Sequence, residues 1–428
     1  MFATIRNAWK IPELRKKILF TLFILLIFRL GNAVPVPGVN VGALTQYFNA
    51  QLSDTVLGLY NAMSGDAFSK ATVFALSIQP YINSSIIIQL LTIAIPALER
   101  LSKEGGEEGR KKIASITRYA TVGLGLLMGF AYYMMLRNYN LLESTGFLPA
   151  VVIILTFTAG SAFLMWLGEQ VNEFGIGNGI SMILFAGIIS RIPSMVGSMF
   201  TNLVAGTLHW LAAIGIVIGV LALIVFIVFI NDAERRIPIQ YAKRVVGRKT
   251  YGGQSTFLPI KVNMSGVLPV IFAQSIASLP ATIAAFMKAP TSKFWIFISE
   301  NVISPSSMIY MFCYFLLIIG FSYFYSTIQY NPIEIANNLK KNGGFIPGFR
   351  PGRPTSDFIA KVISRIVLFG ALYLAVVSIL PMILGNIIKI PSLSIGGTSI
   401  IIVVGVALET VQALESQMLM RQYKGFLE

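Results

Sequence analysis

The sequence predicts an all-α polytopic membrane protein with ten transmembrane helices, and three observations predict that fold class. The chain is 55% hydrophobic and only 12% charged over 428 residues, whereas soluble domains carry about 25% charged residues. Its apolar residues gather in runs long enough to cross a hydrocarbon layer of about 30 Å. Its basic residues lie mainly on one side of the membrane once those runs are placed.

The apolar runs follow one another along the whole chain, each bounded by charged or turn residues. They cover residues 18–34, 71–95, 119–136, 147–168, 179–199, 207–231, 262–287, 308–328, 363–387 and 395–415. A cleaved signal peptide is the alternative for the first run, but that run is long for one and Arg29 interrupts it. We therefore favour an anchored first span.

The distribution of Lys and Arg favours one topology. With the amino terminus in the cytoplasm, most of the 33 Lys and Arg residues lie on the cytoplasmic side. The basic residues left outside are Lys70, Arg137, Arg191, Lys288, Lys293 and Lys389. Because cytoplasmic loops are enriched in basic residues and the number of spans is even, both termini are predicted to be cytoplasmic.

Ionisable residues argue against several classes of function. The single Cys313 allows no internal disulfide, and the single His209 leaves no histidine cluster for a metal. No carboxylate lies at the middle of a span, Glu409 being the nearest, which disfavours an ion-coupled pump. A GxxxxGK[ST] phosphate-binding loop is also absent, so energy for transport has to come from a partner. The alternatives are a small-solute secondary transporter and a membrane enzyme, but the sequence carries neither a midplane ionisable residue nor an assembled acid, base or metal set; no cofactor is predicted.

An odd number of spans in each half gives the two halves opposite orientations. Residues 1–206 are predicted to hold the first five spans and residues 207–428 the second five. Two such inverted five-helix halves can be related by a pseudo-two-fold axis in the membrane plane, which creates a pathway at their interface. Sequence identity between the halves is not evident, so this prediction rests on counting.

Three hydrophilic segments are longer than a turn requires. The external one, residues 35–70, contains a short apolar stretch that either lies on the outer surface or folds back into a cavity. The two cytoplasmic ones, residues 231–261 and 329–361, are basic and rich in Pro and Gly at turn positions. We interpret them as hairpin-like docking arms for a large acidic or nucleic-acid-containing partner, although anionic lipid headgroups account for part of their charge.

Several motifs are specific enough to indicate a family. The most specific run is Thr158–Gln170 (TAGSAFLMWLGEQ), continued by Gly175–Ser181 (GIGNGIS). Further motifs are Lys261–Pro269 (KVNMSGVLP), Ile346–Gly352 (IPGFRPG) and the string around Pro80. Together these motifs resemble those of the SecY family, whose members form the channel of the protein-conducting translocon. The resemblance extends over nearly the whole chain.

The resemblance implies a clamshell of two five-helix halves with an aliphatic pore ring and a re-entrant plug helix near residues 58–68. Carried over position by position, the ring residues are Ile82, Ile86, Ile180, Leu184, Ile271 and Ile402. The plug residues are Gly58, Leu59, Tyr60, Asn61, Ala62, Met63, Ser64 and Gly65. On spacing alone, Ile82 with Ile86 is only an i, i+4 pair typical of ordinary packing.

The resemblance implies a lateral gate and makes polar residues inside two spans candidates for it, although tight helix packing explains these residues equally well. They are Asn83, Ser84, Gln89, Gln274 and Ser275. The resemblance also assigns partner docking to the two cytoplasmic arms. The docking candidates are Lys243, Arg244, Arg248, Lys249 and Arg350.

The function implied by the resemblance is a protein-conducting channel, not an enzyme, in the bacterial cytoplasmic membrane. It translocates unfolded preproteins and releases transmembrane segments laterally into lipid, driven by the SecA motor ATPase or a ribosome. Implied partners are SecE-like and SecG-like small membrane subunits, preprotein signal sequences and anionic lipids. The sequence departs from the family pattern at Ser77, Gln79 and Arg353, which affects the expected gate polarity and partner preference.

Overall fold

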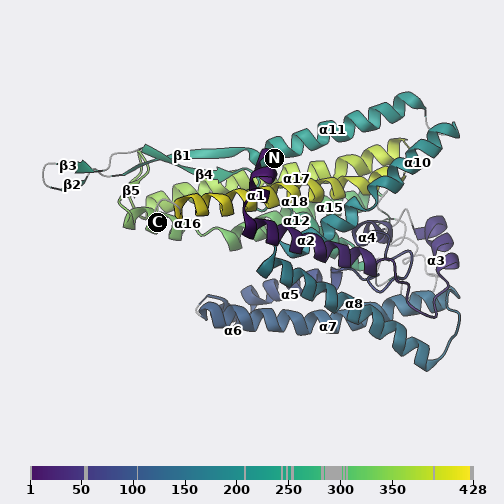
Figure 1. Cartoon of the computed structure of the whole chain (residues 1–428). Coiled ribbons are helices and arrows are strands. Elements are labelled where there is room, and N and C mark those ends of the chain that lie inside the picture. Colours follow the sequence, from purple (N-terminus) through teal and green to yellow (C-terminus); the bar gives the residue numbers. More distant parts are fainter. Residues whose placement is uncertain are drawn as a thin grey trace.

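The structure is a computed structural model that is mostly helical (Figure 1). It describes residues 2–52, 56–103, 105–206, 209–241, 244–246, 249–251, 255–280, 307–388 and 391–424, together with residues 284, 301 and 304. Five short strands accompany the helices in this described part, so the all-α class predicted for the chain is accurate for the bundle but omits a small β element.

Among the described residues, the elements that precede the first strand are all helices. They are α1 (Phe2–Lys10), α2 (Pro12–Gly31), α3 (Val41–Tyr47), the π-helix η1 (Phe48–Leu52), α4 (Val56–Ser64), α5 (Gln79–Ala94), α6 (Pro96–Lys103), α7 (Gly106–Asn138), α8 (Phe147–Phe174), α9 (Gly179–Ile189), α10 (Ile192–Val204) and α11 (Trp210–Asp232). Helices α7 and α8 pack along each other beside α5, on the lower side of the view in Figure 1.

The remainder combines long helices with the strands. They are β1 (Glu234–Tyr241), β2 (Arg244–Val246), β3 (Lys249–Tyr251), β4 (Ser255–Lys261), α12 (Leu268–Ala277), α15 (Met308–Gln329), α16 (Pro332–Lys341), β5 (Gly344–Phe345), α17 (Arg353–Ile388) and α18 (Pro391–Lys424). Helix α17 packs against both α15 and α18, and α18 also contacts α9 and α11. The bundle therefore joins helices from both ends of the chain.

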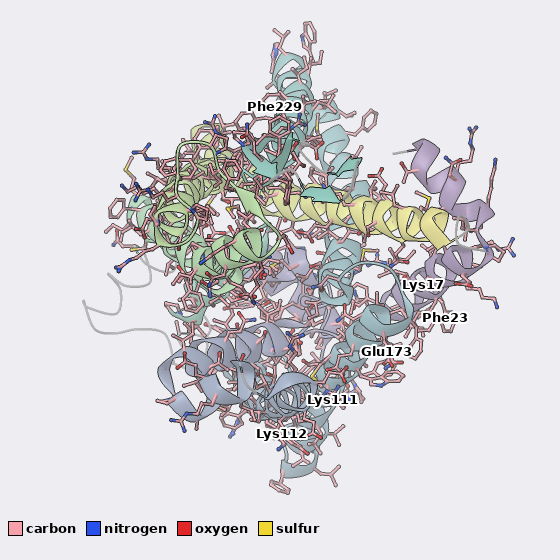
Figure 2. All side chains as sticks on the ribbon, turned by 90° about the vertical axis from the view of Figure 1, so that its left-hand side faces the viewer. Lys17, Phe23, Lys111, Lys112, Glu173 and Phe229 are labelled. Carbon is pink, nitrogen blue, oxygen red and sulfur yellow. The ribbon has the colours of Figure 1, made fainter. Side chains whose placement is uncertain are left out.

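Seven described helical segments are long and apolar enough to cross a membrane, or eight if the bent pair α5–α6 counts as one span. The ten predicted spans are therefore not all matched within the described residues. Helix α2 carries Arg15, Lys16, Lys17 and Arg29 among its residues, and the predicted seventh span is described only in part. Side chains such as Phe23 of α2 and Phe229 of α11 are 58% and 71% exposed and lie on the outside of the bundle (Figure 2), as lipid contact requires.

The predicted helix over residues 71–95 is wrong at its start. Residues 73–78 form turns, Ala71 and Ser77 have positive φ, and α5 begins only at Gln79 with Pro80 in its first turn. The helix ends at Ala94, and the next residue, Ile95, is extended because the residue before a proline is disfavoured in the α conformation. From Pro96 the chain continues as α6, bent by 105° from α5.

The first basic arm folds as the hairpin that its turn residues predict, whereas the second arm contains helix α16 and only the two-residue strand β5, so the hairpin prediction is wrong for the second arm. Strands β1 and β4 pair antiparallel from Glu234–Lys261 to Gln240–Ser255, and the short ribbon β2–β3 extends the same hairpin. Strand β5 from the second arm pairs with the other edge of β1, so the arms share one sheet. Figure 1 shows this sheet projecting from one end of the bundle, opposite the end that holds α3.

Candidate functional site: a central aliphatic constriction

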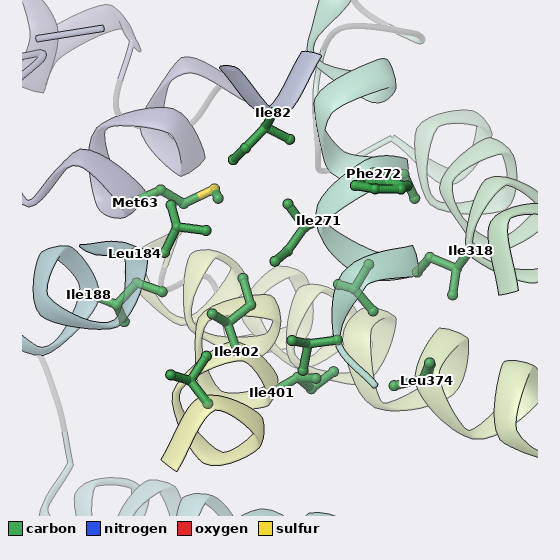
Figure 3. Close-up of a cluster of buried hydrophobic side chains, with 14 of the residues drawn as sticks. Met63, Ile82, Leu184, Ile188, Ile271, Phe272, Ile318, Leu374, Ile401 and Ile402 are labelled. Carbon is green, nitrogen blue, oxygen red and sulfur yellow. The ribbon is translucent and has the colours of Figure 1, made fainter. Parts of the chain in front are cut away.

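The predicted pore-ring residues meet in one buried cluster at the centre of the bundle. Five of them are at most 3% exposed: Ile82 and Ile86 of α5, Leu184 of α9, Ile271 of α12 and Ile402 of α18. Ile180 of α9 is partly buried and packs against the same cluster. Figure 3 shows Ile82, Leu184, Ile271 and Ile402 converging from their separate helices. We call these six residues the apolar ring.

Local sequence explains why α9 can present its side chains to the ring. Gly177 has a φ of +76°, and the side chain of Asn178 caps the helix by accepting bonds from the backbone of Ile180 and Ser181. A Cβ at Gly179 would lie 2.0 Å from the carbonyl oxygen of Gly168, so only glycine allows α8 and α9 to approach this closely. The GIGNGIS motif thus fixes the position of the ring residues on α9.

The entry to α12 follows a similar rule. Gly266 has a φ of +62°, and Pro269 lies in the first turn of the helix, where its missing N–H group costs no hydrogen bond. Val267 packs against Gly405 of α18, where a Cβ would lie 2.4 Å from its side chain. The MSGVLP motif therefore places the entry of α12 directly against α18 at Gly405, and Ile271 and Ile402 belong to the same apolar cluster.

Helix α4, the predicted plug, is buried against this ring. Gly58, Tyr60, Asn61, Ala62, Met63 and Ser64 are all buried. The side chain of Met63 belongs to the same apolar cluster as the ring and lies next to Leu184 in Figure 3. For Leu59, only the backbone placement is described. The structure thus brings the predicted plug and the predicted ring together.

Tyr60 holds the other face of α4. Its hydroxyl donates to the carbonyl oxygen of Leu76 at 2.7 Å, and its ring packs edge-on against Phe68 at 5.2 Å. A tyrosine hydroxyl is protonated at physiological pH even at its ordinary pKa, and burial raises the pKa of Tyr60 further. A small cavity of about 30 Å³, with Met128 and Tyr132 in its wall, lies on this side of the helix.

The gate candidates lie on α5 and α12. Among the hydrogen bonds of the described residues, those that the candidates make go to residues outside the candidate set. Ser275 accepts a hydrogen bond from the amide of Gln79 at 3.2 Å, and this buried bond joins α5 to α12. Gln274 and Ser84 are also buried, at 3% and 0% exposure. Asn83 approaches the sulfur of Met128 at 4.0 Å, and Gln89 bonds to Ser85 of its own helix. Gln79 is not among the predicted gate residues, although an amide side chain within an apolar run was a signal that could have identified it.

The docking candidates lie on the projecting arms. Arg350 is exposed in the turn after β5, where its carbonyl oxygen accepts a hydrogen bond from Thr355 at 2.8 Å. Arg244 and Lys249 lie on the β2–β3 ribbon at the tip of the hairpin. Lys243 and Arg248 fall outside the described residues. Within the described residues there is no group of three His, Cys, Asp or Glu side chains that could hold a metal ion.

Comparison with known proteins identifies the family of this chain. A family model described as SecY matches residues 72–411, most of the chain. The chain belongs to the SecY family. It is 45% identical over 438 residues to the protein translocase subunit SecY of Bacillus subtilis and 42% identical over 442 residues to that of Thermotoga maritima, with 98% or more of each chain covered. These matches cover this chain and at least 98% of each SecY relative, and are therefore not confined to the motifs.

Solved structures share the fold of this SecY family member. A structure described as a protein conducting channel has a TM-score of 0.67 at 18% identity, with 97% of both chains covered. Sec61 in the canine ribosome-channel complex from the endoplasmic reticulum has a TM-score of 0.64 at 15% identity, also with 97% of both chains covered. At this identity the likeness establishes the fold, and the chain is a multi-pass membrane protein of that fold.

Proposed function

We propose that this chain is a protein-conducting channel whose constriction is the apolar ring. The observation that carries the proposal is the convergence of aliphatic side chains from α5, α9, α12 and α18 on one buried point, with Met63 of α4 packed against them. An aliphatic constriction excludes water and therefore ions. Because it offers no fixed polar partner, it accommodates a polypeptide of any sequence.

The small-solute transporter is not favoured by the same site. Such a protein needs a binding pocket with convergent polar or ionisable groups near the midplane. The centre of this bundle instead contains Ile, Leu and Met side chains packed together. The relatives named protein translocase subunit also support the channel over the transporter.

The full architecture is part of the proposal. We propose ten spans in two inverted halves, residues 1–206 and 207–428, in the bacterial cytoplasmic membrane with both termini cytoplasmic. The hydrogen bond from Gln79 to Ser275 then crosses between the halves and makes the α5–α12 seam the lateral gate. Transmembrane segments would leave the channel sideways into lipid through this seam.

The partners follow from the charges of the arms and from the relatives. The exposed Arg350 and the basic β2–β3 tip suit an acidic motor protein or ribosomal RNA, and a Sec61 neighbour is described in a ribosome-channel complex. We propose a SecA-like motor and the ribosome as alternative sources of driving energy. SecE-like and SecG-like subunits, signal sequences and anionic lipids complete the proposed set.

A stalled passenger tests the channel directly. Photo-crosslinking residues are placed singly at Ile82, at Ile271 and at Leu221, which is 57% exposed on α11. A preprotein arrested during export is expected to crosslink to the first two positions and not to Leu221. Crosslinking to none of the ring positions, with export intact, would overturn the constriction.

The docking role is tested by reversing one charge. Arg350→Glu is expected to slow motor-driven export severalfold while the channel accumulates normally, because Arg350 is exposed and only its backbone bonds to Thr355. Arg110→Glu, a charge reversal at an exposed arginine on α7 that lies outside both arms, is the control. Normal export by the Arg350 variant, measured with purified motor and vesicles, rules out this docking site.

A further inference from the structure

A glycine in the left-handed conformation ends helix α4. Gly65 follows the helix with a φ of +70°, the N–H of Asp66 bonds to the carbonyl of Asn61 at 3.0 Å, and the N–H of Gly65 bonds to that of Ala62 at 3.4 Å. This pair of bonds is the Schellman motif, which ends a helix sharply and satisfies its last carbonyls. The motif gives Asp66 a fixed position just beyond the helix.

Asp66 pairs there with a basic residue from another part of the chain. Its Oδ1 lies 2.9 Å from Nε of Arg191, and the same oxygen accepts a hydrogen bond from the amide of Asn61 at 3.0 Å. The two charged side chains are 26% and 24% exposed, so water reaches the pair only in part. Arg191 stands at the break between α9 and α10, where it is the N-cap residue of α10.

Backbone contacts hold the same end of α4 against α9. A Cβ at Gly187 would lie 2.3 Å from the carbonyl oxygen of Met63, and a Cβ at Gly65 would lie 2.8 Å from Oγ of Ser190. Two ties from α2 complete the arrangement. Asn32 donates to the carbonyl of Ser64 at 3.0 Å, and Arg29 donates to that of Gly65 at 3.4 Å.

These polar ties contrast with the contacts on the ring side. The ties reach Arg29, Asn32 and Arg191, which all precede α11 in the chain. Ile271 and Ile402, which follow α11, meet Met63 within the apolar cluster. Apolar contacts separate without a specific bond breaking, whereas the hydrogen bonds from Arg29 and Asn32 are directional and the Asp66–Arg191 pair is held by opposite charges.

We propose that Arg191 is a positioning residue that acts through Asp66 to hold α4 against the ring and so sets how strictly the channel stays closed. When the α5–α12 seam opens, α4 remains tied to the first part of the chain, and its displacement requires the Asp66–Arg191 pair to separate as a second step. This inference rests on the proposed function of α4 as the plug.

The test is a double-mutant cycle in the full-length channel with its companion subunits in vesicles. Asp66→Asn keeps an oxygen for Asn61 but removes the charge, and Arg191→Gln removes the partner charge. Each is expected to raise the ion leak of the resting channel about three- to fivefold, the population change that loss of a partly exposed ion pair gives. Each should also permit export of a reporter with a defective signal sequence.

The pair acts as a unit if the double variant Asp66→Asn with Arg191→Gln leaks no more than either single variant. Arg191→Lys keeps the charge and is expected to restore most of the closure. Arg137→Gln, an exposed arginine at the end of α7, is the matched control and should leak like the parent. Additive leaks in the double variant, or parental leak in both single variants, overturn the proposal.

A variant of the apolar ring distinguishes failure of the positioning role of Arg191 from failure of the proposed plug function of α4. Ile402→Asn, assayed in the same vesicles, is expected to leak if the ring and α4 seal the channel. Leak from that variant but not from the Asp66 and Arg191 variants removes only the positioning role. If none of these variants leaks, the proposal that the apolar ring and α4 seal the channel is wrong.

Discussion

Gly187 lies where the proposed plug and α9 touch backbone to backbone. Replacing it with alanine would put a Cβ 2.3 Å from the carbonyl oxygen of Met63, so α4 or α9 has to move. Overpacking of this kind costs about 1–3 kcal/mol. Gly187→Ala is therefore expected to shift α4 and to increase ion leak, measured by vesicle conductance. Gly219→Ala on α11, with open space around it, is the control, and equal leak from both variants would contradict this packing argument.

At the residue scale, the sequence predicts functional positions only where a motif carries them, and it does not predict contacts between residues far apart in the chain. Ile82 and Ile86 were identified through the resemblance, because the spacing of two isoleucines on a helix does not distinguish a pore from ordinary packing. Asp66 and Arg191 were not singled out at all as a pair. Only the fold brings the end of α4 to the break between α9 and α10.

At the level of elements, apolar runs predicted α8, α11 and α15 well because a lipid-exposed helix needs continuous hydrophobicity and little else. The start of α5 was not predictable in that way. Residues 71–78 are apolar enough for a helix, but Tyr60 bonds to the carbonyl of Leu76 and Val73 bonds to that of Val34. Tertiary hydrogen bonds thus replace the helical ones in this segment. Similarly, turn residues indicated the hairpin but not the pairing of β5 with β1.

The α5–α12 seam carries its own prediction. Ser275→Ala leaves the amide of Gln79 buried without its partner, which costs about 1–3 kcal/mol, whereas replacing both partners with apolar groups is nearly neutral. Ser275→Ala is therefore expected to lower the melting temperature of the purified channel, and Gln79→Leu with Ser275→Ala to regain most of it. Ser198→Ala, an exposed serine bonded only within α10 among the described contacts, is the control. A double variant as unstable as Ser275→Ala alone would exclude the pair as the cause.

At the scale of the whole molecule, the seal depends on residues from distant parts of the chain meeting at one point. Helix α5 supplies Ile82 and α18 supplies Ile402, and neither is a barrier alone. Ile402→Asn places an amide among aliphatic side chains, and a polar group there attracts water into the constriction. The variant is expected to stabilise partly open states and to relax rejection of preproteins with defective signal sequences by about tenfold or more, if hydrating the ring offsets about 1.4 kcal/mol of the closing free energy.

Export of a reporter with and without a functional signal sequence measures this selectivity in cells that carry equal amounts of each channel. Leu419→Asn, at a position that is 60% exposed on the same helix, introduces the same amide away from the ring and should keep the parental selectivity. Both variants introduce one asparagine into α18. A difference in selectivity between them therefore results from the position of the amide and not from its chemistry. Equal selectivity in the two variants would place the barrier elsewhere in the bundle, and the convergence at Ile402 would then be packing alone.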